Sequence, residues 1–183
     1  MEARAVILAA GESKRMGEQK LLMPFRGRPM IDWVIDAAQE WHPVVVAGTQ
    51  VVTTLRDAPV SLVENAAPER GMTHSLVLAN ANVPKDAALI VLLGDKPLVT
   101  HALIHLVCER LGDADVAYPV HRDTLQPGHP VVFSARARQH IDALPEGDTL
   151  QLLRDDPSLA HVRILTEDEG AYFDVDSREA LEH

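Results

Sequence analysis

The segment Ala5–Lys20, AVILAAGESKRMGEQK, joins an apolar, strand-like run to a short loop that carries glycines and cations. The apolar run stops before Gly11, and Arg15, Gly17 and Lys20 follow it. Glycine lets backbone N–H groups approach phosphate oxygens closely, and arginine and lysine neutralise the phosphate charge. The loop therefore predicts a polyphosphate site, which makes nucleotide chemistry the leading functional hypothesis.

The loop matches neither of the two better-known phosphate motifs. A Walker loop requires Gly-Lys after four intervening residues, but Met16 stands where its second glycine belongs. The G-x-G-x-x-G pattern of dinucleotide-binding proteins is absent as well. We therefore expect the loop to hold a triphosphate while residues elsewhere in the chain hold the catalytic metal ion.

A carboxylate follows the end of another predicted strand. The apolar run Ala88–Leu93 ends at Gly94, and Asp95 comes next. Ligands of open α/β sheets bind beyond the carboxyl ends of the strands, so Gly11 and Asp95 are expected to face one crevice. Because Asp95 stands just before Pro97 with one residue between them, a turn residue that bonds its own backbone is the alternative.

These residue types suit the transfer of a nucleotidyl group. A phosphate oxygen attacks the α-phosphorus and pyrophosphate leaves, so catalysis depends on positioning and charge stabilisation rather than on a protein nucleophile. Lys20 and Arg15 can offset charge on the triphosphate. Mg²⁺ favours carboxylate and phosphate oxygens with retained waters, so one or two aspartates are sufficient, and Asp95 can be one of them.

Short apolar segments alternate with segments of helical period along the chain. Strands are predicted over Arg4–Ala9, Pro43–Ala47, Ser61–Glu64, Ala88–Leu93, Asp115–Val120, His129–Ser134, Val162–Thr166 and Tyr172–Val175. Helices are predicted over Pro29–Trp41, Gly71–Ala81, the segment that Thr100 caps and Leu111 ends, Ala135–Leu144 and Thr149–Arg154. This order indicates an α/β fold: a Rossmann-like three-layer α/β/α arrangement with a mostly parallel central sheet.

The second half of the chain departs from the strand–helix alternation. Val162–Thr166 and Tyr172–Val175 are expected to form a small late β-hairpin region. No repeat, low-complexity tract or linker interrupts the chain, so residues 1–183 are interpreted as a single domain. The final Leu181-Glu182-His183 is typical of the start of a vector-derived histidine tag and is assigned no role.

The composition restricts the kinds of partner. A net charge of -10 argues against nucleic-acid binding, which requires clustered positive charge. No apolar run approaches membrane-spanning length and no signal segment opens the chain, so no membrane association is expected. The single cysteine, Cys108, excludes an internal disulfide and predicts a cytoplasmic location and a packing role.

Residues 8–20 resemble a longer and more specific signature, that of the MobA-like nucleotidyltransferases, L-A-[AG]-G-x-S-x-R-M-G-x-x-K. Every fixed position is filled here, as LAAGESKRMGEQK. Four later segments resemble the same family in the same order. They are Gly71–Leu76 (the G-M-x-x-S-L segment near the nucleotide), Gly94–Pro97 (the G-D-x-P metal motif), Gly128–Phe133 (the acceptor-side G-H-P-V-L-F segment) and Asp174–Ser177 (the late D-x-D-[ST] element).

The resemblance implies a role for each matching position. It implies catalytic roles for Arg15, Lys20 and Asp95, and an Mg²⁺ site formed by Asp95, Asp174 and Asp176. It implies an acceptor side at Gly128, His129 and Pro130. The nucleotide-binding residues that it implies are Leu8, Ala9, Ala10, Gly11, Ser13, Arg15, Lys20 and Ser75.

Within this family the chain looks most like the molybdenum cofactor cytidylyltransferases, through Ala9-Ala10-Gly11, Lys20–Leu22 and the G-H-P segment. The guanylyltransferase branch usually has Ala-Gly-Gly and lacks G-H-P. The resemblance therefore implies transfer of CMP from CTP to the phosphate of molybdenum-bound molybdopterin. The implied partners are CTP, the molybdopterin acceptor, and a molybdenum hydroxylase or its chaperone.

Two departures keep alternatives open on the acceptor side. Lys96 stands where glutamine or methionine is common, and Gly147–Leu152 lacks the second glycine and the arginine of the family's G-D-x-G-A-R segment. The alternatives are a sugar 1-phosphate or alcohol phosphate as acceptor, the guanylyltransferase activity of the same family, and a non-catalytic nucleotide-binding protein that delivers a cofactor.

Two further groups of polar residues have more than one interpretation. Asp174 and Asp176 alternate in a strand-like run, so one of them can face the site while the other caps the helix expected after Ser177. His101 and His105 lie one helical turn apart and could bind a metal ion. A solvated helix face is the favoured interpretation of this pair, because no third ligand is evident.

Overall fold

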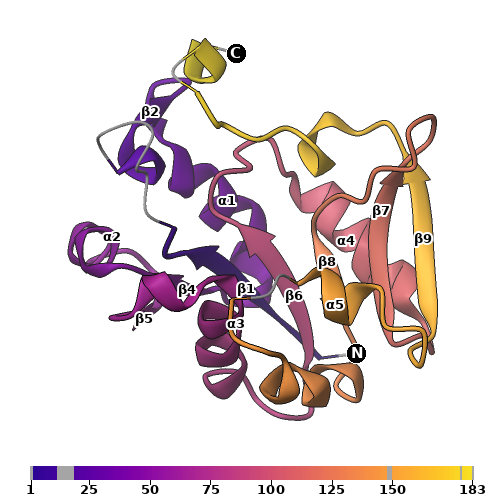
Figure 1. Ribbon diagram of the computed structural model, residues 1–183. Coiled ribbons are helices and arrows are strands. Elements are labelled where there is room, and N and C mark those ends of the chain that lie inside the picture. Colours follow the sequence, from indigo (N-terminus) through magenta and orange to yellow (C-terminus); the bar gives the residue numbers. More distant parts are fainter. Residues whose placement is uncertain (1, 12–18, 148–149, 178, 183) are drawn as a thin grey trace.

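A seven-stranded sheet forms the centre of the part of the chain that the computed structural model describes, residues 2–11, 19–147, 150–177 and 179–182 (Figure 1). The strands lie in the order β5-β4-β1-β6-β8-β7-β9. Among them only β8 runs antiparallel to its neighbours, which confirms the mostly parallel α/β fold. The strands are β1 Ala3–Ala9, β4 Val44–Ala47, β5 Ser61–Glu64, β6 Ala88–Leu93, β7 Val116–His121, β8 Val131–Phe133 and β9 His161–Thr166.

Helices connect these strands and cover the sheet. The α-helices are α1 Met30–Ala38, α2 Thr49–Thr54, α3 Met72–Ala81, α4 His101–Leu111 and α5 Gln151–Arg154. The 3-10 segments are η1 Lys20–Leu22, η2 Gln39–Trp41, η3 Pro68–Arg70, η4 Ala137–Ala143, η5 Glu169–Ala171 and η6 Glu179–Glu182. Thr100 caps α4 as predicted, because its hydroxyl accepts a hydrogen bond from the Leu103 N–H at 3.1 Å.

Strand β1 shows why the central strands are apolar along their whole length. Its side chains alternate between the two faces of the sheet, as those of any strand do. Ala5 and Ile7 belong to the core that contains α1 and α4, whereas Val6 and Leu8 belong to the core that contains α3. Helices on both faces bury both sets, which gives the three-layer arrangement.

The strand order reverses beside β1. The chain passes from β1 outward to β4 and β5, and it then returns to pair β6 with the other side of β1, with Leu8 opposite Leu93. Such a reversal opens a crevice at the carboxyl ends of the two central strands. Gly11 and Asp95 follow β1 and β6 at this edge, as the sequence predicts.

The C-terminal segment runs from β9 back to β2 (Figure 1). The predicted late hairpin is wrong: β9 pairs in parallel with β7, and Tyr172–Val175 forms no strand. The polar backbone groups of this segment bond to other parts of the chain. The Val175 N–H donates to the Asp95 carbonyl at 3.1 Å, and the Tyr172 carbonyl accepts from Lys96 Nζ at 3.2 Å.

Other differences from prediction concern short elements. A two-stranded hairpin, β2 Pro24–Phe25 with β3 Arg28–Pro29, and helix α2 were not expected. Pro29 therefore precedes α1 instead of beginning it, and the expected helix ends as the 3-10 segment η2. The longest described helix, α4, has 11 residues, and no described helix is long and apolar enough to cross a membrane.

Candidate active site

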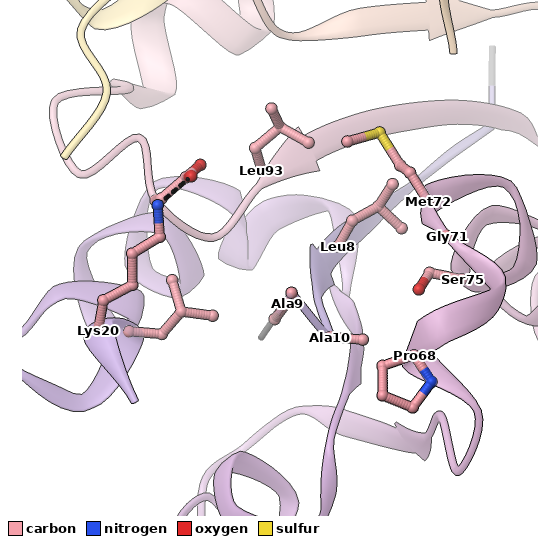
Figure 2. Close-up of a pocket in the computed structure, with 12 residues that line it drawn as sticks. Leu8, Ala9, Ala10, Lys20, Pro68, Gly71, Met72, Ser75 and Leu93 are labelled. Carbon is pink, nitrogen blue, oxygen red and sulfur yellow. Dashed lines mark hydrogen bonds and ion pairs between the residues drawn. The ribbon is translucent and has the colours of Figure 1, made fainter. Parts of the chain in front are cut away.

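A cavity of about 290 Å³ opens at the carboxyl edge of the sheet, where the ends of β1 and β6 meet the beginning of α3 (Figure 2). Seven of the residues predicted from the sequence line it: Leu8, Ala9, Ala10, Gly11, Lys20, Ser75 and Asp95. The remaining lining residues are Leu21, Pro68, Gly71, Met72 and Leu93. Two predicted residues of the first loop, Ser13 and Arg15, lie outside the described residues.

Lys20 lies at one end of this cavity, and its ammonium group lies among carboxylates. Lys20 Nζ donates to Asp95 Oδ2 at 2.8 Å, the contact that is dashed in Figure 2. It also donates to the Val175 carbonyl at 3.1 Å and to Asp176 Oδ1 at 3.3 Å. The adjacent Leu21 is buried in the core, so the stem of Lys20 begins from a fixed backbone. The structure therefore brings the first loop, the end of β6 and the C-terminal segment to one point.

The charges around Lys20 raise its pKa. Partial burial by itself would lower the pKa of Lys20, but the ion pairs with Asp95 and Asp176 outweigh that effect and raise the pKa. Lys20 is therefore fully protonated at neutral pH. Its single positive charge reduces the repulsion between the two carboxylates and leaves the group with a net negative charge.

The same two carboxylates are the groups at this end of the cavity that could hold a divalent cation. Asp95 and Asp176 both contact Lys20 Nζ from different segments, so a cation bound between them would lie near the position of that ammonium group. Mg²⁺ is commonly held by one or two carboxylates together with phosphate oxygens and water. No three His, Cys, Asp or Glu side chains of the described chain form a metal-binding group, so phosphate and water would complete the coordination.

Asp174 takes a different position from Asp176. Its carboxylate forms an ion pair with Lys96, whose side chain is 7% exposed, against 43% for Asp174. Asp174 is therefore held by Lys96. The two alternating aspartates thus have different partners. Asp174 pairs with Lys96, whereas Asp176 shares Lys20 with Asp95.

Gly71 forms part of the cavity wall where only glycine fits. Its φ is +86°, a conformation that residues with a side chain rarely adopt. A Cβ atom at this position would also lie 2.9 Å from the Cα of Gly147. The loop before α5 thus packs directly on the N-terminus of α3, and the Gly147 N–H donates to the Arg70 carbonyl at 3.2 Å.

Ser75 faces the cavity from the first turn of α3, and Asn65 lies behind it. Asn65 Nδ2 donates to Ser75 Oγ at 2.9 Å, and both side chains are almost fully buried. The sequence prediction named Ser75 but not Asn65. Asn65 directly follows β5, so the rule that drew attention to Gly11 and Asp95, a polar or small residue after a parallel strand, would have found it.

Gly128, His129 and Pro130 are not among the residues that line the cavity. They lead into β8, whose Val131 pairs with Val91 of β6, so they lie level with the carboxyl end of β6. Gly128 permits a close approach, because a Cβ there would lie 2.7 Å from the Ala171 carbonyl oxygen.

The His129 imidazole is held in its neutral form. Burial, with the nearby charges of Lys96 and Arg154, lowers its pKa to about 3. Within the described chain, His129 Nε2 is buried without a hydrogen-bond partner. Near the end of β6, His129 Nε2 is therefore a buried nitrogen whose hydrogen-bonding capacity is not satisfied by the described residues.

His101 and His105 lie on the exposed face of α4, in agreement with the favoured interpretation. The two side chains are 53% and 52% exposed, and they contact Glu40 and Glu109, respectively. Cys108 on the same helix is half-buried and packs against the core. Burial, followed by the charge of Glu40, raises the pKa of its thiol to about 12.

Comparison with protein-family models gives a match over most of the chain. Residues 5–162 match the model described as the MobA-like NTP transferase domain. Among curated proteins, the chain is 35% identical over 159 residues to the bifunctional protein GlmU of Sinorhizobium fredii (strain NBRC 101917 / NGR234). That alignment covers 78% of this chain but only 35% of the GlmU protein.

Solved structures share the fold at low sequence identity. A manganese complex of Rv0371c from Mycobacterium tuberculosis H37Rv has a TM-score of 0.80 and 21% identity, covering 100% of this chain and 97% of the other. Molybdopterin-guanine dinucleotide biosynthesis protein A from Archaeoglobus fulgidus has a TM-score of 0.74 and 15% identity, covering 98% and 95%. A CTP complex of CMP:2-keto-3-deoxy-manno-octonic acid synthetase has a TM-score of 0.79 and 17% identity, covering 100% and 96%.

Proposed function

Because the chain belongs to the MobA-like NTP transferase family, we propose that it transfers a nucleotidyl group from a nucleoside triphosphate to a phosphorylated acceptor. One observation carries the proposal. The ammonium group of Lys20 lies within hydrogen-bond distance of both Asp95 and Asp176 at the end of the cavity between β1 and β6. A cation and two converging carboxylates are the groups that a metal-bound triphosphate requires.

In the proposed reaction a phosphate oxygen of the acceptor forms a bond to the α-phosphorus of the nucleotide. The bond from that phosphorus to the bridging oxygen breaks, and pyrophosphate leaves. Lys20 stabilises negative charge on the phosphates, and Arg15 is proposed to do the same from the first loop. Asp95 and Asp176 hold Mg²⁺, which supplies positive charge to the phosphate oxygens when it is bound.

The cavity supplies the remaining contacts to the nucleotide. We propose that the backbone around Leu8–Gly11, together with Ser75, binds the base and sugar, and that Ser13 contributes from the first loop. About 290 Å³ lies near the lower limit for a small-molecule site, so the cavity suits a base while the phosphates extend toward Lys20. Asp174 then has an indirect role: its ion pair with Lys96 fixes the segment that carries Asp176.

The specific reaction proposed is the transfer of CMP from CTP to the phosphate of molybdenum-bound molybdopterin. The motif resemblance to the cytidylyltransferases supports it, as does a structural neighbour from molybdopterin-guanine dinucleotide biosynthesis. Gly128, His129 and Pro130 are proposed to meet the acceptor, because they flank the end of β6 on the side away from the base cavity. The product would pass to a molybdenum hydroxylase or its chaperone, and a cytoplasmic location is part of this proposal.

Pyrophosphate release tests the proposal. Purified protein would be assayed with Mg²⁺ and each of CTP, GTP, UTP and ATP, first with molybdenum-loaded molybdopterin and then with sugar 1-phosphates and alcohol phosphates. We expect turnover with CTP and the molybdopterin acceptor, and its loss in Asp95→Ala. No turnover with this pair would overturn the cytidylyl transfer.

The other outcomes separate the alternatives. Turnover with GTP and molybdopterin would assign the guanylyltransferase activity, and turnover with a sugar or alcohol phosphate would assign another acceptor. Nucleotide binding that survives Asp95→Ala, without turnover of any pair by the unaltered protein, would indicate a cofactor-delivery protein instead.

A further inference from the structure

We propose that the Lys20 ammonium group occupies the cation position between Asp95 and Asp176, so that the site excludes free divalent cations and accepts a metal ion only as a metal–triphosphate complex. This inference rests on the proposed function, because it assumes that a triphosphate binds at this end of the cavity. It deepens that function by naming the form in which the substrate is bound, and it assigns the selection of that form to Lys20.

The two roles proposed for this end of the cavity compete for the same oxygen atoms. Lys20 Nζ lies 2.8 Å from Asp95 Oδ2 and 3.3 Å from Asp176 Oδ1. Mg²⁺ binds carboxylate oxygens at about 2.0–2.1 Å, so an ion held by these two oxygens would lie near the ammonium group. Two positive charges so close together repel strongly. The ammonium group must therefore move away before the two oxygens hold a metal ion.

Three acceptors from two segments hold the ammonium group in place. Besides the two carboxylates, the Val175 carbonyl accepts from Lys20 Nζ at 3.1 Å. The adjacent Leu21 is buried in the core, which fixes the backbone from which the Lys20 side chain extends. Hydrogen bonds between charged groups are stronger than neutral ones. Displacement by a hydrated metal ion alone is therefore unfavourable, because the ammonium group would exchange these partners for water.

A bound triphosphate supplies the ammonium group with new partners. Lys20 lines the cavity, and Figure 2 shows its side chain across the cavity from Pro68 and Ser75. The phosphates of a nucleotide whose base lies near Ser75 extend toward Lys20. Lysine carries its ammonium group on a flexible stem of four carbons, so Nζ can turn from the carboxylates to phosphate oxygens while the backbone stays in place. The two carboxylates are then available to the metal ion of the complex.

Exclusion of free cations depends on this ammonium group and not on burial of the carboxylates. The Asp176 side chain is 68% exposed, so cations in solution can reach it. Turning Lys20 toward phosphate therefore couples the two ligands: the triphosphate strengthens metal binding. Such coupling is reciprocal, so the metal ion strengthens triphosphate binding by the same factor.

Lys20→Met tests the exclusion, because it keeps an unbranched side chain and removes the charge. The probe is Mn²⁺ without nucleotide, and the measurement is its dissociation constant from the electron paramagnetic resonance signal of unbound Mn²⁺. We expect Lys20→Met to bind Mn²⁺ about ten- to a hundredfold more tightly than the unaltered protein. Lys85→Met is the matched control: Lys85 is exposed and precedes β6, whereas Asp95 follows that strand, so its loss should leave the constant unchanged.

A double variant shows where the additional Mn²⁺ binds. Asp95→Asn combined with Lys20→Met removes one of the two carboxylates, so the gain in Mn²⁺ affinity should be lost. Lys20→Gln serves in the same experiments if Lys20→Met does not fold. A Mn²⁺ affinity of Lys20→Met equal to that of the Lys85→Met control, or a gain that survives Asp95→Asn, would overturn the exclusion by Lys20.

A second titration tests the exchange of partners. Preformed equimolar complexes of Mn²⁺ with CTP, GTP, UTP or ATP are titrated into the unaltered protein by calorimetry, and the best-bound complex is then titrated into Lys20→Met. Because phosphate oxygens replace the carboxylates as partners of Lys20, we expect Lys20→Met to bind the complex no more tightly than the unaltered protein. A gain as large as that for Mn²⁺ alone would mean that Lys20 does not turn to the phosphates.

The outcomes distinguish this inference from the function on which it rests. If the unaltered protein binds none of the four complexes, the proposed function fails, and the selection of a metal–triphosphate complex fails with it. If the unaltered protein binds a complex while Lys20→Met gains no affinity for Mn²⁺ alone, the role assigned to Lys20 fails and nucleotide binding stands.

Discussion

The ion pair between Lys96 and Asp174 joins a buried ammonium group to a carboxylate that is largely in water. The Lys96 side chain is 7% exposed, and that of Asp174 is 43% exposed. Lys96 Nζ also donates to the Tyr172 carbonyl at 3.2 Å, so its charge is fully engaged by the C-terminal segment. Lys96 therefore needs the ion pair to compensate a buried charge, whereas the Asp174 carboxylate can be solvated without it.

Removal of Asp174 should destabilise the protein more than removal of Lys96. Asp174→Ala leaves a buried cation with a single carbonyl partner, which is expected to cost about 2–4 kcal/mol. Lys96→Met keeps most of the side-chain volume and leaves Asp174 to water, at a cost below about 1 kcal/mol. Urea unfolding of both variants measures the difference, and a larger loss in Lys96→Met would refute the argument.

Substitution of Lys20 should lower the rate of catalysis. The residue is proposed to stabilise charge that develops on the phosphates. Lys20→Ala is therefore expected to lower kcat/KM, through an increase of about 2–4 kcal/mol in the activation free energy. Initial rates of pyrophosphate release measure it. Lys85→Ala, which removes an exposed lysine elsewhere, is the control for the loss of one positive charge. A rate for Lys20→Ala equal to that of the control would show that the first loop has been given the wrong role.

Gly71→Ala, compared with Gly27→Ala, tests whether the contact with Gly147 adds to the cost of a side chain at a positive φ. The substitution places a side chain at a φ of +86° and 2.9 Å from the Cα of Gly147, so we expect a loss of stability of about 2–4 kcal/mol together with weaker nucleotide binding. Gly27 has a similar φ of +85° with nothing within 4 Å, so Gly27→Ala should carry the strain alone. Equal losses in the two variants, measured by denaturant unfolding, would mean that the contact with Gly147 contributes nothing.

The sequence predicted the elements whose signals are local. The apolar runs of β1 and β6, the Thr100 cap of α4 and the approach of Gly11 to Asp95 all follow from periodicity and from the geometry of parallel strands. The late hairpin was mistaken because alternation in Tyr172–Val175 resembles a strand. In the fold that backbone bonds to Asp95 and Lys96 instead, and no local rule predicts those partners.

The parts of the site that were not predicted depend on contacts between distant segments. The alternation of the two aspartates was predicted, but the choice of Asp176 as the partner of Lys20 follows from the path of the C-terminal segment between Lys20 and Lys96. Gly71 meets Gly147 only because the loop before α5 packs on α3. Asn65 reaches Ser75 because β5 lies beside β4, which brings the end of β5 close to the helix that follows.

Acidification should destabilise the folded protein through His129. Its pKa is about 3 in the folded chain, against about 6.5 for an unperturbed histidine. Between these two values the unfolded chain binds the additional proton, so the stability that neutral His129 contributes is present above about pH 6.5 and is lost progressively as the pH falls toward 3. The slope reaches at most about 1.4 kcal/mol per pH unit.

His129→Gln removes this titration, so the variant should lose less stability than the unaltered protein between about pH 6.5 and pH 4.5, by about 2 kcal/mol. Urea unfolding at a series of pH values measures the two slopes. His42→Asn, at an exposed histidine in a left-handed backbone conformation, controls for the loss of a histidine as such. Because the carboxylates are common to all three proteins, their acid titration cancels in the comparison. Parallel slopes for His129→Gln and the unaltered protein would mean that the imidazole is accessible to protons in the folded chain.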